Sequence, residues 1–325
     1  MLQYTETKSG TRWYNLTAKS LGEVISEFPR DLMAEKVVVL PDLSPSSRAL
    51  LPNGSCVVID QNKDPRWRRF AVSDVGCGMA LVRSKVQFDD FDRNLDAWDE
   101  MARRLRQNKG KKGDLGRGNH FLDAVVDSAG NETSVYFAIH TGSRDESPKA
   151  NHLVNNPSKF DTTYKEIKDW ARGNRHEITH MLEAFYGQTE IVFDRPHNFY
   201  IQRDNRAFIY KGSVKLSPGE ETVIPSNLDG EMAIVQANNK IFEIEGAMSH
   251  GTGRLMRRAL AKVLSYTYDF DGLKKRIIIS EGISNASLRG ELPYGYRKLD
   301  DCLSLLDEVA QTTKRLTTVA YIGQI

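Results

Sequence analysis

The sequence predicts a single domain of the mixed α/β class over residues 1–325. Short apolar runs rich in β-branched residues recur along most of the chain, and two longer segments between them have the spacing of amphipathic helices. Neither an internal repeat nor a linker rich in Pro, Gly or Ser divides the sequence. One large domain of this length accommodates all of these elements.

Strand and helix signals alternate irregularly along the chain. Apolar positions predict a helix over 95–105 and a longer one over about 161–185, capped near Asp161 and stopped at Gly187. A short helix is expected from about Leu299. The predicted strands are 37–40, 55–59, 80–86, 135–139, 189–193, 208–214, 221–224, 232–236, 276–279 and 317–322.

The composition is that of a globular protein without a general affinity for polyanions. With 45 Lys and Arg against 43 Asp and Glu, the net charge is only +2, so any surface for nucleic acid must be local. No apolar run approaches the eighteen residues of a membrane span, and the N-terminus lacks the apolar core of a signal peptide. Cys56, Cys77 and Cys302 are odd in number and widely spaced, which favours a reducing, cytoplasmic environment.

Two short basic segments have competing interpretations. Residues 66–70 (Arg-Trp-Arg-Arg-Phe) interleave cations with aromatics, a pattern that suits stacking on bases, although an exposed turn with an aromatic anchor is favoured. Residues 109–113 (Lys-Gly-Lys-Lys-Gly) form either a contact for a phosphate backbone or a plain solvated loop.

The segment 246–262 presents a histidine in a setting that suits phosphate chemistry. His250 lies between a serine and the glycines 251 and 253, and the apolar spacing after Arg254 predicts a helix. His250 would then lie just before a helix N-terminus, where free N–H groups favour phosphate. The segment alone leaves two interpretations level, a phosphate ligand or nucleophile and a solvated histidine in a glycine-rich turn.

A set of potential metal ligands is spread over the chain. Asp74 and Cys77 share a glycine-rich loop that can bring both to one metal, although a buried structural cysteine beside a capping aspartate is favoured on local evidence. Four of the seven histidines border a loop: His120, His140, His197 and His250. Sulfur, nitrogen and oxygen ligands in this number suffice for two divalent metals, and a bridging thiolate suits a borderline transition metal. Paired metals of this kind serve phosphoryl transfer or hydrolysis.

The ordered motifs resemble the RtcB family of RNA-splicing and repair ligases. They are Asp-Val-Gly-Cys-Gly at 74–78, Gly-Asn-His-Phe-Leu at 118–122, His-Thr-Gly-Ser-Arg at 140–144, His-Asn-Phe at 197–199 and Ser-His-Gly-Thr-Gly-Arg at 249–254, with further similarity at 170–175, 210–212 and 292–296. The resemblance runs from about residue 72 to 300. It implies an RtcB-like catalytic domain, with a central, mostly antiparallel sheet system flanked by helices.

The resemblance also implies roles for individual residues. His250 matches the histidine that becomes covalently guanylylated, and Cys77 matches a thiolate that bridges two Mn²⁺ ions. The matched manganese ligands are Asp74, Cys77, His120, His140 and His197. The positions expected to contact nucleotide or phosphate are Asn119, Asp123, Arg144, Asn227, Arg254 and Tyr296.

The implied activity is a GTP- and Mn²⁺-dependent joining of RNA ends, as in tRNA splicing or RNA repair. RNA ending in a 2′,3′-cyclic phosphate or 3′-phosphate is joined to RNA with a 5′-hydroxyl through a histidine–GMP intermediate and an RNA end activated with GMP. The resemblance leaves room for an activating protein partner.

Two departures affect the expected nucleotide pocket. The end of the chain, 321–325, lacks the lysine usual in the family, and the segment 225–230 differs from the family's Pro-Gly-Ser-Met-Gly. An alternative is therefore a metal-dependent RNA-end phosphodiesterase, or an enzyme that guanylylates RNA 3′ ends without sealing. A catalytically silent RNA-binding relative is a third reading, disfavoured by the retained ligand positions.

Overall fold

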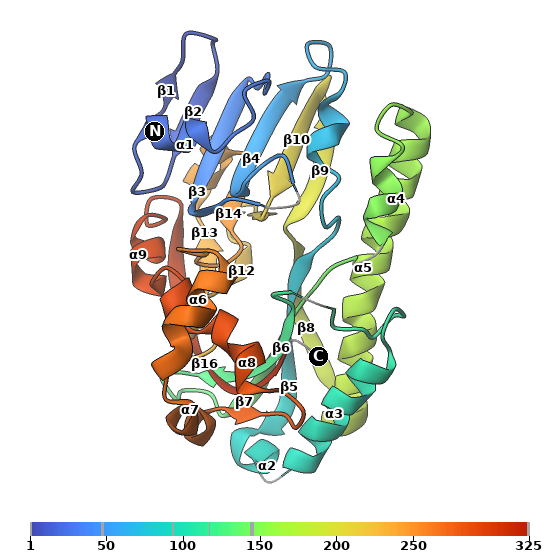
Figure 1. Ribbon diagram of the computed structural model, residues 1–325, viewed down its shortest axis with the longest axis vertical. Coiled ribbons are helices and arrows are strands. Elements are labelled where there is room, and N and C mark those ends of the chain that lie inside the picture. Colours follow the sequence, from blue (N-terminus) through green and yellow to red (C-terminus); the bar gives the residue numbers. More distant parts are fainter. Residues whose placement is uncertain (1, 47–48, 93, 117, 144–145, 324–325) are drawn as a thin grey trace.

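The computed structural model describes residues 2–46, 49–92, 94–116, 118–143 and 146–323 (Figure 1). Within these ranges it is a mixed α/β structure, in which most strand pairs are antiparallel and helices flank the sheets. Only the pairs β2–β3 and β15–β16 are parallel among the described strands. The predicted fold class is confirmed.

The described strands form two large sheets and one small one. The six-stranded sheet has the order β1 (Thr5–Glu6), β2 (Arg12–Asn15), β3 (Lys36–Ser44), β4 (Asn53–Asp60), β10 (Arg206–Lys211) and β9 (Asn198–Arg203). The second large sheet has the order β12 (Glu221–Pro225), β13 (Glu231–Ala237), β16 (Ala310–Gly323), β6 (Phe121–Asp127), β7 (Ser134–Thr141), β5 (Gly78–Gln87) and β8 (Thr189–Pro196), with β15 (Ile278–Ile279) on β16. The small sheet pairs β11 (Ser213–Lys215) with β14 (Ala247–Ser249).

Helices cover the sheets on two sides. Figure 1 shows the long α5 (Pro157–Tyr186) running beside both large sheets, with α6, α7 and α8 gathered on the other side. The remaining α-helices and the 3₁₀ helices are α1 (Leu21–Ser26), α2 (Phe88–Asp92), α3 (Leu95–Gln107), α4 (Pro148–Asn151), α6 (Arg258–Leu264), α7 (Phe270–Arg276), α8 (Asn285–Leu288), α9 (Leu299–Ser304), η1 (Trp67–Phe70), η3 (Asn239–Ile244), η4 (Ser265–Thr267), η5 (Arg289–Glu291) and η6 (Pro293–Gly295).

The apolar cores hold the two large sheets together. Side chains of β3 and β4, such as Leu40 and Val58, share one buried cluster with Ala233 of β13. The other face of the six-stranded sheet packs on Tyr164 of α5, and the same helix covers the second sheet with Ile178. A single long helix thus fixes the edge along which residues from both sheets meet.

The structure also revises several predicted elements. α5 begins at Pro157, before the expected cap, because Asn156 accepts a hydrogen bond from the backbone N–H of Lys159 and proline suits the first helical position. Gly187 ends the helix with φ 71°, as predicted. The strand β6 was not predicted, since its start lies in a motif that reads as a glycine-rich loop.

The aromatic and basic segment 66–70 is neither an exposed turn nor a platform for bases. It contains η1, in which Trp67 and Phe70 are each only 1% exposed. Arg68 is buried too, and its guanidinium binds the carboxylate of Asp161 through two hydrogen bonds of 3.0 and 3.1 Å. Packing against α5 therefore uses all three side chains.

Candidate functional site

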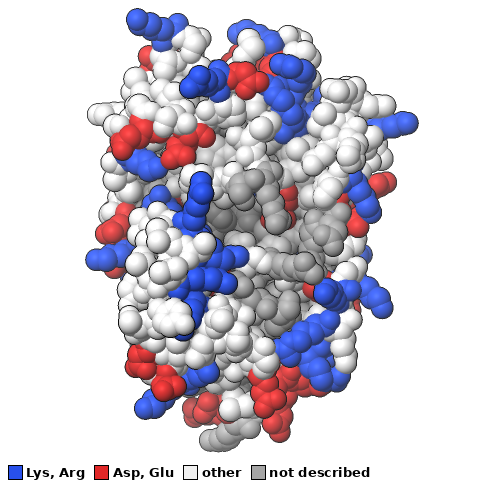
Figure 2. Space-filling model, in the orientation of Figure 1, with Lys and Arg blue, Asp and Glu red and all other residues white. Residues whose placement is uncertain are grey.

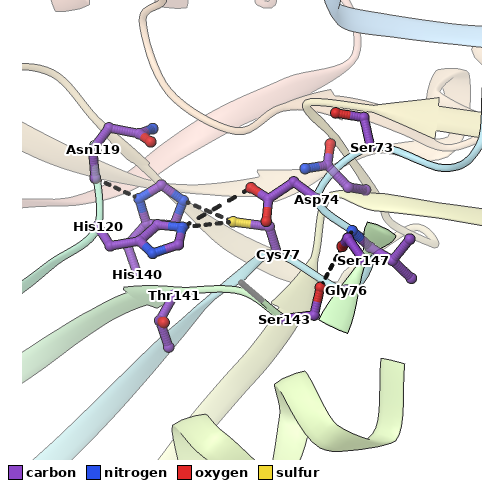
Figure 3. A network of polar contacts seen from close by, with 12 residues as sticks. Ser73, Asp74, Gly76, Cys77, Asn119, His120, His140, Thr141, Ser143 and Ser147 are labelled. Atoms are coloured by element: carbon purple, nitrogen blue, oxygen red, sulfur yellow. Dashed lines mark hydrogen bonds and ion pairs between the residues drawn. The ribbon is translucent and has the colours of Figure 1, made fainter. Parts of the chain in front are cut away.

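A buried thiol lies next to two imidazoles (Figure 3). Sγ of Cys77 is 3.4 Å from Nε2 of His140 and 3.5 Å from Nε2 of His120. All three side chains are buried, and their ligand atoms lie within 4.8 Å of one another. A group with this geometry can hold a metal ion.

On each histidine ring, the hydrogen bond made by Nδ1 determines which nitrogen carries the proton. Nδ1 of His120 lies 3.1 Å from the backbone oxygen of Leu115, and Nδ1 of His140 lies 3.0 Å from that of Asn119. A carbonyl oxygen can only accept, so each Nδ1 carries the hydrogen of a neutral ring. The lone pair of each Nε2 is therefore free and directed toward Cys77, which is the state that binds metal.

Three adjacent strand ends bring these ligands together. Cys77 directly precedes β5 and His120 directly precedes β6, while His140 lies in β7, between those two strands in the sheet. His140 pairs with Met79 on one side and with Phe121 on the other. Antiparallel register therefore places the three ligands at one edge of the sheet.

Arg175 of α5 ties down the segments that carry the ligands. Its Nη1 donates to the backbone oxygens of Gly76 and Thr141, each at 3.0 Å, and its Nε donates to Oδ1 of Asp194 at 2.6 Å. The guanidinium side chain is only 2% exposed and the carboxylate 9%. One buried guanidinium thus connects the loop before Cys77 to the end of β7, and its ion pair with Asp194 links both to β8.

The other two predicted metal ligands lie beside this cluster. Oδ2 of Asp74 is 3.9 Å from Nε2 of His120, and Asp74 has the left-handed φ of 51° that strained functional residues often adopt. The ring of His197 is 5.2 Å from that of His140, and its buried Nδ1 has no hydrogen-bond partner among the described residues. Cys77, His120 and His140 therefore reach mutual ligand distance, while Asp74 and His197 are adjacent to them.

Burial gives these groups the properties of metal ligands. It lowers the pKa of His120 and lowers those of His140 and His197 further, because a charged ring loses its hydration there. The rings are thus neutral donors. Burial, reinforced by the charge of Asp74, raises the pKa of the Cys77 thiol, so a thiolate here requires a nearby cation. Sulfur, imidazole and carboxylate donors together fit a divalent transition metal.

His250 directly follows β14 and lies next to the cluster. Its Nδ1 is 2.5 Å from Oδ2 of Asp42, and Oδ1 of the same carboxylate accepts a hydrogen bond of 2.9 Å from the Ser249 hydroxyl. Asp42 is fully buried. Because an ionised carboxylate only accepts, Nδ1 carries the hydrogen and Nε2 keeps a lone pair for attack. The ring centroid lies 4.6 Å from that of His197.

The helix predicted from Arg254 onward is wrong. α6 begins only at Arg258, and a loop separates it from His250. Gly253 has φ +72°, and a Cβ there would lie 2.5 Å from the backbone oxygen of Asp42, so this loop packs tightly on β3. His250 is therefore held by a side chain from another strand and not presented at a helix N-terminus.

Asp42 is a site residue that the sequence reasoning missed. The pairing of β3 with β4 is irregular between Val39 and Ser44, and Asp42 lies within that irregularity. Such bulges redirect side chains, here toward His250. The available signal was a charged residue two positions after the apolar run 37–40, and an ordinary loop also accounts for such a residue.

A cavity of about 250 Å³ opens beside His250 and brings most of the other predicted residues together. It is lined by five of the six predicted nucleotide contacts: Asn119, Asp123, Asn227, Arg254 and Tyr296. Arg144, the sixth, lies outside the described residues. His140 also lines the cavity, which joins it to the thiol–imidazole cluster. Arg258, Glu291 and Tyr321 line it as well and were not predicted.

Two arginines and a tyrosine share one carboxylate in the cavity wall. Nη2 of Arg254 lies 2.8 Å from Glu291 and 2.7 Å from the hydroxyl of Tyr296, and Arg258 lies 3.0 Å from the same carboxylate. The Arg254 guanidinium also stacks over the Tyr296 ring at 4.4 Å. Two cations against one anion leave a net positive charge here, which suits a phosphate.

Asp123 is a buried carboxyl with spare hydrogen-bonding capacity. It pairs with Tyr321 across β6 and β16, and its Oδ1 has no hydrogen-bond partner within the described ranges. Burial raises the pKa of Asp123 well above its usual value. An unpartnered buried carboxyl in a cavity wall is a candidate contact for a ligand.

These features define a mixed α/β protein with a candidate metal centre beside a cavity that contains an oriented histidine. No family model matches the chain. Two curated proteins do: the tRNA-splicing ligase RtcB of Nanoarchaeum equitans, 23% identical over 77% of this chain and 67% of its own length, and the RNA-splicing ligase RtcB of Escherichia coli strain K12, 22% identical over 77% and 81%. The chain is thus a relative of the RtcB family, as its motifs predict.

Across the described ranges, none of the helices has the length and apolar character that crossing a membrane demands.

Proposed function

We propose that this protein is an RNA ligase that uses GTP and a divalent metal to join 3′-phosphate or 2′,3′-cyclic phosphate ends to 5′-hydroxyl ends. One observation carries the proposal: a histidine oriented by a buried carboxylate lines the same cavity as His140 of the Cys77 cluster. The names of the two relatives, both RNA ligases, support the same activity.

In the proposed first step, Nε2 of His250 attacks the α-phosphorus of GTP. A P–N bond forms, the bond to pyrophosphate breaks, and positive charge develops on the imidazole. The Asp42 carboxylate, 2.5 Å from Nδ1, stabilises that charge and keeps the ring in place. Divalent metal at the Cys77 cluster, with two Mn²⁺ ions as the family resemblance implies, would neutralise charge on phosphate oxygens.

The later proposed steps transfer GMP to RNA and then release it. An oxygen of the RNA 3′-phosphate attacks the phosphorus on His250, so the P–N bond breaks and the RNA end carries GMP through a new anhydride bond. The 5′-hydroxyl of the second RNA then attacks the 3′-phosphate, forming a phosphodiester and expelling GMP. Activation is required because an unmodified phosphate oxygen is a poor leaving group. Where the end is a cyclic phosphate, water first attacks its phosphorus, so the bond to the 2′-oxygen breaks and a 3′-phosphate with a free 2′-hydroxyl is left.

The proposed nucleotide contacts divide between base and phosphate. The Tyr296 ring, backed by the Arg254 guanidinium, offers a surface for the guanine. Oδ1 of Asp123 can accept from the N–H groups that distinguish guanine from adenine. Asn119 and Asn227 would contribute amide groups from the same cavity, and we assign phosphate contacts to Arg144 and to Arg254. The three free, buried cysteines favour a cytoplasmic location for this activity.

The proposal is tested with one mixture that contains Mn²⁺, GTP and two labelled RNAs, one with a 2′,3′-cyclic phosphate end and one with a 5′-hydroxyl. We expect a joined product whose formation requires all three components. Opened or guanylylated ends without any joined product would establish the non-sealing alternative. RNA that is bound but chemically unchanged would identify a silent relative.

A further inference from the structure

A row of aromatic and cationic side chains leads outward from the nucleotide cavity. The Arg289 guanidinium stacks over the Tyr266 ring at 4.0 Å and lies 5.5 Å from the Phe270 ring. The Phe270 ring contacts Tyr268 at 5.5 Å, and Tyr268 contacts Tyr294 at 6.1 Å. Five side chains from α7, η4, η5 and η6 and the segments between them thus form one connected series of contacts, edge-to-face between the rings, hereafter the aromatic row.

Both ends of the aromatic row are open to solvent. Tyr266 is 75% exposed and Tyr294 is 44% exposed. Tyr266 in addition is held in place from behind by Arg289. The Tyr266 ring, fixed on one face and open on the other, is ready to stack with a planar ligand at little cost in ordering.

The aromatic row is attached directly to the cavity wall. Tyr294 lies two residues before Tyr296, and the backbone oxygen of Gly290, next to Arg289, accepts a hydrogen bond of 2.7 Å from Arg254. The hydroxyl of Tyr268 binds Asp229, in the same loop as the cavity residue Asn227. A strand whose end lies in the cavity can therefore continue over these rings.

Positive charge accompanies the aromatic row. η4 directly follows α6, which carries Arg258 and Lys262 and is preceded by the exposed Arg257. Figure 2 shows a column of Lys and Arg side chains over this part of the molecule. On a chain with a net charge of only +2, this is the kind of local basic surface that a phosphate backbone requires.

We propose that the aromatic row, with Tyr266 and Tyr294 at its open ends, binds unpaired bases of the RNA strand that enters the cavity. The identification of the ligand as RNA rests on the proposed function. Exposed rings backed by a guanidinium and flanked by cations are the arrangement that holds single strands without reading their sequence. Paired bases have their faces covered by neighbours, so the substrate must be unpaired for several nucleotides next to the break.

The neighbouring helix α6 also exposes aliphatic side chains, Leu260, Val263 and Leu264. Aliphatic side chains alone would suit a protein partner. The rings and cations favour nucleic acid, because each of them has a matching group on a single strand, base or phosphate.

The test measures affinity of the full chain for a fluorescent 12-nucleotide unpaired RNA with a 3′-phosphate, by anisotropy, without GTP and with EDTA. The double variant Tyr266→Ala/Tyr294→Ala should bind this RNA at least about tenfold more weakly than the unsubstituted protein. Tyr266→Phe/Tyr294→Phe, which keeps both rings, should retain the affinity. Tyr4→Ala, a 46% exposed tyrosine by the six-stranded sheet, serves as the control and should leave it unchanged.

A second RNA with its 3′-phosphate at the blunt end of a hairpin should bind weakly and equally to all variants. Unchanged affinity of the alanine double variant for unpaired RNA would overturn the proposal. Evidence that this surface binds a protein would also overturn the proposal. Such evidence would be that Leu260→Ser/Val263→Ser alone dissociates a protein complex in sedimentation while the tyrosine variants bind RNA normally. The measurement needs no GMP transfer, so failure of the proposed function appears separately, as absent GMP labelling of the unsubstituted protein.

Discussion

Oδ2 of Asp42 lies 2.5 Å from Nδ1 of His250, although the two residues are 208 positions apart. Asp42 comes from an irregular part of β3, and His250 follows β14. Gly212, with φ +55°, lies against the ring, and a Cβ at this position would approach Cε1 of His250 to 3.0 Å. The ring is therefore confined on one side and hydrogen-bonded on the other, which leaves Nε2 as its reactive atom.

The substitution Asp42→Asn should slow attachment of GMP to the protein by roughly 100-fold or more, because the ring loses the charge that stabilises its cationic form. Ser249→Ala removes one hydrogen bond from the same carboxylate but keeps its charge, so it should slow the step less than Asp42→Asn does. The rates are measured with radiolabelled GTP under identical metal concentrations. Equal rates for Asp42→Asn and the unsubstituted protein would show that the carboxylate has no part in the step.

Removal of the central thiol should remove the metal. We expect Cys77→Ala to lower affinity for a divalent transition metal beyond the 10- to 100-fold range that loss of an outer partner causes. Cys56→Ala is the matched control, because Cys56 is a fully buried thiol in the six-stranded sheet. Elemental analysis after dialysis provides the measurement. Equal metal content in the two variants would refute a site at Cys77.

Arg175 should be among the costliest positions for stability. Arg175→Met leaves the Asp194 carboxylate buried without its partner, so the free energy of unfolding should fall by about 3–5 kcal/mol. Arg172→Met, at an exposed position one turn earlier on α5, should change it by less than about 0.5 kcal/mol. Urea unfolding of both variants decides this, and a similar small effect at both positions would contradict the assigned role of the ion pair.

Stability should depend on pH through Asp123. Burial raises the pKa of this carboxyl above the usual 3.8, so at intermediate pH the unfolded chain is ionised while the folded protein still holds the proton. Stability contributed by this group therefore falls as pH rises from about 3.8 to the raised pKa. Asp123→Asn lacks the titration, so its advantage over the unsubstituted protein should grow by about 1.4 kcal/mol per pH unit in that window. Urea unfolding from pH 5 upward measures it, and a difference independent of pH would contradict a raised pKa.

Local sequence patterns were sufficient to predict those helices and strands whose apolar residues are buried with the regular spacing of the element. α3 and the strands β4, β7 and β13 lie where apolar spacing predicts them. β6 was not predicted because its first residues belong to a polar and glycine-rich motif. The stretch after His250 was wrongly predicted to be helical because its apolar residues, such as Leu255, are exposed in a loop. The prediction of one domain over 1–325 remains a prediction.

Site residues were found where their motif carried recognisable chemistry. Cys77, His120 and His140 come together as expected, and five predicted contacts line the cavity. Asp42 and Arg175 both act through partners that are far away in the sequence. Arg175 lies within a motif that served only to support the family resemblance and was not assigned a role of its own. A buried carboxylate that holds a histidine 208 positions away leaves no local pattern, since only the packing of β3 on β14 brings the two together.

The central claim, that His250 carries the nucleotide, is tested most directly by transfer of label from [α-³²P]GTP to the protein in the presence of Mn²⁺, with mapping of the labelled peptide. We predict an acid-labile adduct on the peptide that contains His250, absent in His250→Ala and lost when RNA with a 3′-phosphate is added. An adduct that persists in His250→Ala, or none in the unsubstituted protein under these conditions, would contradict the account.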